Sequence, residues 1–126
     1  MNTNIEFHDS EVAAVEAAEG ALTIRFSAVW ARRVDAAGDT GYMPDVVLRL
    51  DQPAWSGDLA ACVGRLSGGE LCVGVQQGGR VPLPFEAKGP VRMRLAFSNG
   101  AVLSAEASAV RLAQTGEARF VESLNC

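Results

Sequence analysis

His8, Asp9 and Ser10 carry the side-chain types of a nucleophilic triad, and His8 is the sole histidine of the chain. A triad needs the serine to reach the histidine and the histidine to reach the acid in one line. Consecutive residues alone cannot supply that line, because their side chains alternate on a strand and fan out on a helix. There is also no G-x-S-x-G elbow to present a serine. We therefore expect a turn or kink in which Asp9 or Ser10 bonds a backbone N–H, and keep the three residues as catalytic candidates that would need partners from elsewhere.

Metal ligands at useful spacings are missing from the sequence. One histidine and the scattered Cys62, Cys72 and Cys126 form no ligand pair typical of zinc, so we expect no metal and no cofactor. If a turn at Ser67–Gly69 joins two strands, Cys62 and Cys72 become diagonal neighbours that are badly placed for a disulfide. We therefore expect reduced thiols, with Cys126 at the chain end exposed.

The segment "DAAGDTGYMPD" contains Asp35, Asp39 and Asp45, and oxygen-rich loops can bind calcium. Its spacing is not that of the twelve-residue calcium loop, and the closing glutamate is missing. Aspartate and glycine are common in turns without any ligand, so we expect a solvated connection that forms a mobile rim.

Three aromatic residues suggest a binding surface. Trp30 continues the inward face of an expected strand, so we place it in the core. Tyr42 and Trp55 lie at strand ends beside turns, where partial exposure would let them contact a ligand or a partner. They are our candidate ligand- or partner-binding residues.

Composition sets the class of protein. The chain has 126 residues, of which 48% are hydrophobic and 21% charged, and no linker divides it, so we expect one domain over 1–126. A net charge of −4 disfavours nucleic acid and anionic membranes as partners, and an acidic face would suit a basic protein. No apolar run reaches bilayer-spanning length and the N-terminus lacks signal-peptide features, so a cytoplasmic location is expected.

Short alternating runs between regularly spaced turn signals predict an all-β fold, an antiparallel β-sandwich or barrel built from hairpins. In "ALTIRFSAVW" the apolar residues from Leu22 to Trp30 recur with period two. "VVLRLD", "ELCVGV" and "VPLPF" alternate in the same way, and the prolines of the last run predict an edge strand or an irregular connection. Edge strands would also allow two copies to pair as a homodimer.

Residues 9–18 fit two structures. An acidic or hydroxyl cap followed by glutamates and alanines could begin a helix. A two-residue Glu19-Gly20 loop instead sets Val15 opposite Ile24 and Ala17 opposite Leu22, the pattern of paired strands. We favour the strand, because periodicity is the stronger signal.

The run "VRMRLAFSNGAVLSAEA" predicts the best-specified hairpin. A three-residue loop with Gly100 left-handed pairs Leu95 with Leu103 and Arg92 with Glu106, whereas a two-residue loop sets core residues against polar ones. Basic residues accumulate at Arg32 and Arg33 and again at Arg92 and Arg94. Because Glu106 is expected opposite Arg92, we interpret the second group as part of a neutralised sheet surface.

The opening "FHDS" and "EVAAVE", the following strand "LTIRF" and the closing "ARFVESL" resemble small bacterial β-rich proteins, some of them similar to immunity proteins of contact-dependent toxin systems. The resemblance covers mainly residues 5–26 and implies a cytosolic β-domain with a protein partner, without any catalytic residue. We therefore expect a non-catalytic, protein-binding domain with an immunity or accessory role. The alternatives are a carbohydrate- or small-ligand-binding β-sandwich using Tyr42 and Trp55, and a hydrolase using His8.

Overall fold

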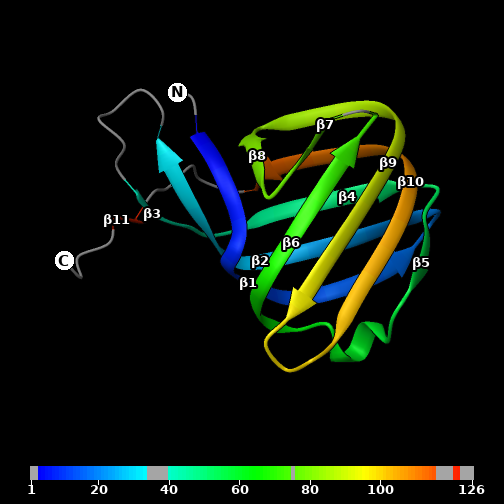
Figure 1. The fold of residues 1–126 in the computed structure, drawn as a ribbon, viewed down its shortest axis with the longest axis horizontal. Coiled ribbons are helices and arrows are strands. Elements are labelled where there is room, and N and C mark those ends of the chain that lie inside the picture. Colours follow the sequence, from blue (N-terminus) through cyan, green and yellow to red (C-terminus); the bar gives the residue numbers. More distant parts are fainter. Residues whose placement is uncertain (1–2, 34–39, 75, 116–120, 123–126) are drawn as a thin grey trace.

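The chain forms an antiparallel β-barrel in a computed structural model that describes residues 3–33, 40–74, 76–115 and 121–122 (Figure 1). Strands β1, β2, β4, β10, β9 and β6 pair in that order, and β6 pairs back to β1, which closes the ring. This confirms the predicted all-β antiparallel architecture. The elements are β1 (Thr3–Ala18), β2 (Ala21–Arg33), β3 (Thr40–Met43), β4 (Val46–Asp51), β5 (Ala54–Ser56), η1 (Leu59–Ala61), β6 (Gly64–Val73), β7 (Gln76–Gly78), β8 (Arg80–Leu83), β9 (Phe85–Phe97), β10 (Val102–Gln114) and β11 (Val121–Glu122).

Short strands extend the barrel at its edges. β3 adds to β2 and carries β11, while β8 adds to the start of β1 as the last strand of the sheet order. β5 pairs with β10, and β7 pairs with β6. Strands β3 and β5 lie at opposite ends of the long axis of the molecule (Figure 1). Among the described residues, no helix has the length and apolar character needed to cross a bilayer.

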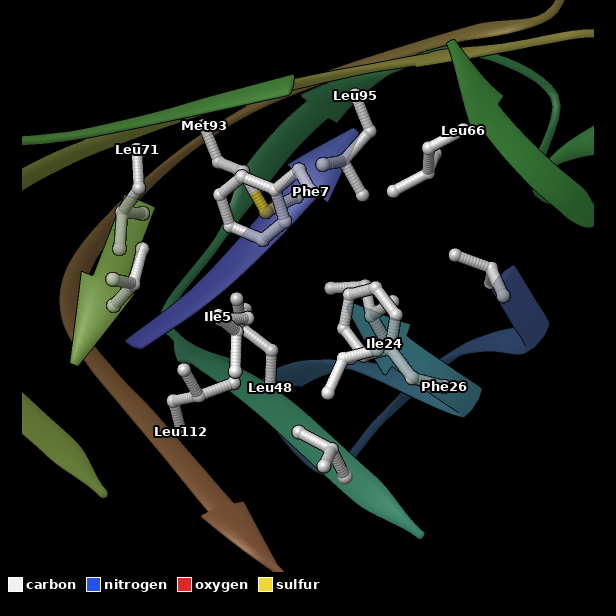
Figure 2. Packing of buried hydrophobic residues seen from close by; sticks show 14 of the residues in the cluster. Ile5, Phe7, Ile24, Phe26, Leu48, Leu66, Leu71, Met93, Leu95 and Leu112 are labelled. Atoms are coloured by element: carbon white, nitrogen blue, oxygen red, sulfur yellow. The ribbon is translucent and has the colours of Figure 1, made fainter. Parts of the chain in front are cut away.

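The barrel interior is filled by apolar side chains. Figure 2 shows residues such as Ile5, Ile24, Leu48, Leu95 and Leu112, which come from five strands, pointing into one interior, and each of them is fully buried. Their positions follow the period-two pattern of the sequence, since alternate residues of a strand face the same side. A filled interior leaves the outer faces and edges of the sheet as the surfaces on which a binding site can form.

Both predicted hairpin registers are confirmed. Val15 lies opposite Ile24 and Ala17 opposite Leu22, so residues 9–18 belong to a strand and not to a helix. Leu95 lies opposite Leu103, and Gly100 closes the loop with a φ of 94°. The Gly100 N–H donates to the Phe97 carbonyl over 3.0 Å, which fixes the three-residue loop.

The pairing of β1 with β2 is irregular at the step predicted to be a kink. Residues 7–10 of β1 lie opposite Val29 alone, and Asp9 has a φ of 70°. A second bulge at Ser27 changes which residues of β2 face inward, so that Val29 and Ala31 are buried while Trp30 is half-buried. The prediction that Trp30 belongs to the core was wrong, because it assumed alternation without a bulge.

The predicted turn at Ser67–Gly69 does not exist, since β6 runs unbroken through it. Gly69 serves close packing instead: an ideal Cβ there would lie 2.9 Å from both Phe7 Cβ and Leu95 Cδ2. The diagonal arrangement of Cys62 and Cys72 that depended on this turn is therefore wrong as well. Both cysteines are free thiols, as expected. Gly89, which could also be taken for a turn residue, lies within β9, beside an irregularity in its pairing with β10.

Candidate functional site

A hollow on the outside of the barrel brings polar and aromatic side chains together over four neighbouring strands. It is lined by residues 54–56 of β5, Glu70 and Cys72 of β6, residues 92–94 of β9 and residues 104–106 of β10. Its volume is about 560 Å³, within the range of sites that accept a small molecule or a group of side chains. We call it the outer hollow.

The strand register explains why charged side chains line the outer hollow. Val91, Met93 and Leu95 of β9 are buried, so the alternate residues Arg92 and Arg94 face outward. Across β9, Arg92 lies between Glu106 of β10 and Cys72 of β6. In the next outward row, Arg94 lies between Ser104 and Glu70. Two neighbouring outward rows therefore place charged groups on both sides of a central pair of arginines.

Strand β5 forms the edge of the hollow next to β10 and carries an aromatic residue. Trp55 lies opposite Ala105 in the β5–β10 ladder and keeps 40% of its surface exposed. Gly57, with a φ of 128°, follows β5, and an ideal Cβ there would lie 2.5 Å from the Val102 carbonyl oxygen. This close approach holds the end of β5 against β10. Trp55 is thus placed as predicted, exposed beside a turn.

The arginines of the outer hollow differ from four other arginines of the barrel, although Arg32 and Arg65 likewise form no ion pair with a described residue. Within the described part of the chain, neither Arg92 nor Arg94 forms an ion pair, although Glu106 is opposite Arg92 as predicted. Elsewhere arginines meet carboxylates at 3.2–3.8 Å: Arg25 with Glu16, Arg49 with Asp51, Arg80 with Glu6 and Arg111 with Glu86. The predicted register is present without the close pairing that a neutralised surface would show. The hollow therefore offers two guanidinium groups to a ligand.

The cysteines lie in different environments. Cys72 is half-buried and lines the outer hollow, whereas Cys62 is fully buried. Burial, and to a smaller extent the charge of Asp58, raise the pKa of the Cys62 thiol. A buried thiol that is held in its protonated form is a poor nucleophile, which fits a structural role for Cys62.

The His8 and Asp9 side chains meet, but the Ser10 side chain does not join them. His8 Nδ1 and Asp9 Oδ2 lie 3.1 Å apart on an exposed surface, and none of the three residues lines the outer hollow. Ser10 is fully buried; its Oγ donates to the Glu6 carbonyl over 2.6 Å and accepts from the Trp30 N–H over 3.0 Å. The serine hydroxyl therefore satisfies backbone groups at the kink, the kind of role predicted for it.

Tyr42 and Trp55 are not brought into one site. Tyr42 contacts Trp30 edge-on, with ring centroids 4.9 Å apart, on β3 at the far end of the molecule from β5 (Figure 1). Neither ring is buried in the core, since Tyr42 is half-buried and Trp55 exposed. A ligand site built jointly from these two residues does not form.

Metal-binding groups do not cluster in the residues that the structure describes. Asp45 is exposed, and its carbonyl accepts bonds from the Thr115 N–H and hydroxyl. Asp35 and Asp39 lie outside the described residues, as does Cys126.

A second depression of about 350 Å³ lies between β6, β7 and β8. Its walls are mainly apolar and include Leu71, Val81 and Phe85. Its charged member Arg80 is paired with Glu6 at 3.6 Å. It therefore offers a ligand fewer unpaired polar groups than the outer hollow.

Comparison with known proteins gives no relative: no family model, no curated protein and no solved structure matches the chain.

Proposed function

We propose that this protein is a non-catalytic binding domain that recognises a protein partner through the outer hollow. The observation that carries the proposal is the hollow in which Arg92 and Arg94 face outward without an ion pair among the described residues, and to whose lining the exposed Trp55 also belongs. Tryptophan and arginine are the residues most often found at the energetic centre of protein interfaces. The hollow is open to solvent on the barrel surface, and an exposed face of this kind suits binding of a large partner.

The sequence supports the same class of function. The resemblance of residues 5–26 to immunity proteins makes a cognate toxin the first partner to test. Use of His8 in hydrolysis finds less support, because its side chain is 67% exposed and lines neither of the two depressions. Pairing of two copies through edge strands stays a prediction, and in the edge strand β8 Pro82 has no N–H to donate.

Trp55→Ala is expected to weaken partner binding by roughly 30-fold or more, the loss typical of a central tryptophan anchor. The partner would be captured from the source organism with the tagged full-length chain, and the affinity of the purified pair measured by titration calorimetry. Val63→Ala is the matched control, because Val63 is also 40% exposed but lies outside the hollow. An equal loss in both variants, or none in Trp55→Ala, would contradict the proposal.

A further inference from the structure

Arg92 and Arg94 form a pair of neighbouring cationic groups in a hollow. Both face outward from β9 at positions two apart, which separates their Cα atoms by about 7 Å. Arginine side chains are long enough for both guanidinium groups to meet at one point between them. A carboxylate has two oxygens and accepts several N–H donors, so it can be held by both arginines at once.

The surroundings limit what kind of anion fits. The outer hollow also contains the carboxylates of Glu70 and Glu106, which balance the two arginines in formal charge, and the whole chain has a net charge of −4. A polyanion would be repelled by these charges, whereas a single carboxylate gains two charge-assisted contacts locally. At the β5 edge of the hollow, Ala54 lies opposite Glu106 and Trp55 is the next residue; both line the hollow and offer apolar surface to the residues that flank such a carboxylate.

We propose that the partner places one acidic side chain, flanked by apolar residues, between Arg92 and Arg94 in the outer hollow. This inference depends on the proposed function and specifies the chemistry of the partner. The acidic residue belongs to an exposed segment of the partner protein, because the hollow lies on an open outer face that a protruding chain can reach. The apolar neighbours of the acidic residue pack against the β5 edge of the hollow, at Ala54 and Trp55.

The test uses two capped peptides, Gly-Leu-Glu-Leu-Gly and its neutral counterpart Gly-Leu-Gln-Leu-Gly, titrated into the ¹⁵N-labelled full-length protein and followed by NMR. We expect the glutamate peptide to bind at least about five-fold more tightly than the glutamine peptide and to shift the signals of β5, β6, β9 and β10. Raised salt should reduce this preference, because the contacts are exposed charge pairs.

Substitutions of single arginines test whether the preference for the glutamate peptide comes from the outer hollow. Arg92→Gln and Arg94→Gln should each remove most of the difference between the peptides. Arg49→Gln is the matched control, because Arg49 is an exposed strand arginine already held by Asp51 at 3.2 Å, and it should leave the difference unchanged. Equal binding of the two peptides, no binding of either at about 5 mM, or an equal effect of the control would overturn the inference.

Two further results separate the alternatives. Acetate that binds the same residues as tightly as the glutamate peptide would indicate a small-anion site and overturn the acidic-segment proposal. Partner binding that is lost in Trp55→Ala but kept in both Arg92→Gln and Arg94→Gln would refute the inference and leave the proposed function intact. Partner affinity that is unchanged in Trp55→Ala, Arg92→Gln and Arg94→Gln would refute both the inference and the proposed function.

Discussion

Gly69→Ala is expected to lower the free energy of unfolding by about 2 to 3 kcal/mol, the upper range for overpacking a core. The added methyl group would lie 2.9 Å from Phe7 Cβ and Leu95 Cδ2 and 3.2 Å from the Arg94 carbonyl oxygen. Phe7 Cβ is fixed to the backbone of β1, so it cannot move away as a flexible side-chain end could. Denaturant unfolding followed by far-UV circular dichroism would measure the loss.

Gly68→Ala provides the control for this prediction. Gly68 is the preceding residue of β6, and an ideal Cβ there has no neighbour within 4 Å. We expect its unfolding free energy to stay within about 0.5 kcal/mol of the original chain, as for ordinary surface changes. If the two variants were equally stable, β6 would not approach β1 and β9 as closely as the fold requires.

Ser10→Ala is expected to destabilise the protein by about 2 kcal/mol, because it removes a hydroxyl that satisfies two backbone groups. Without it, the Trp30 N–H and the Glu6 carbonyl lose a partner beside a fully buried side chain. The same unfolding experiment measures this effect, and the position of Trp30 makes tryptophan fluorescence a second reporter of local change.

Ser27→Ala is the control for Ser10→Ala, because it removes a serine hydroxyl from an exposed position outside the kink of β1. The Ser27 hydroxyl donates to Glu11 Oε1 over 2.6 Å at an exposed position, so its removal should cost less than about 0.5 kcal/mol. Equal effects of the two substitutions would mean that Ser10 does not hold the kink of β1. His8→Ala should also leave stability nearly unchanged, since its contact with Asp9 is exposed.

Much of the fold could be predicted because local pattern and pairing agree. In the hairpin of β9 and β10, one register alone sets Leu95 against Leu103, and the Asn99-Gly100 pair supplies the turn. In the hairpin of β1 and β2, the Glu19-Gly20 turn and the alternation around Val15 lead to the same register. Burial on one face strongly constrains register, since a shift by one residue reverses every side chain.

The errors arose where one residue type serves two structural purposes. Glycine permits a turn, but at Gly69 it permits two strands to pack closely, and the sequence does not separate these uses. In β2 the residues from Ala28 to Ala31 are largely apolar on both faces, so the pattern does not mark the bulge that turns Trp30 outward. Long-range packing decided both cases.

The site was predicted only in part. Trp55 was identified from its place beside a turn, but the pairing of the short β5 with β10 has no local signal and decides what surrounds this ring. The predicted register did place Arg92 opposite Glu106, and it could not show that the two side chains remain without an ion pair among the described residues. Side-chain geometry, which the sequence does not specify, therefore distinguishes a binding surface from a neutral one.

The most direct test of the binding surface is amide hydrogen exchange of the full-length protein with and without its purified partner. If the partner binds in the outer hollow, added protection centres on β5 and on the outer-hollow segments of β6, β9 and β10, including residues 92–94 and 104–106. Protection centred instead on β3 around Tyr42, or on the kink at His8, with the outer hollow unchanged, would contradict the proposed function.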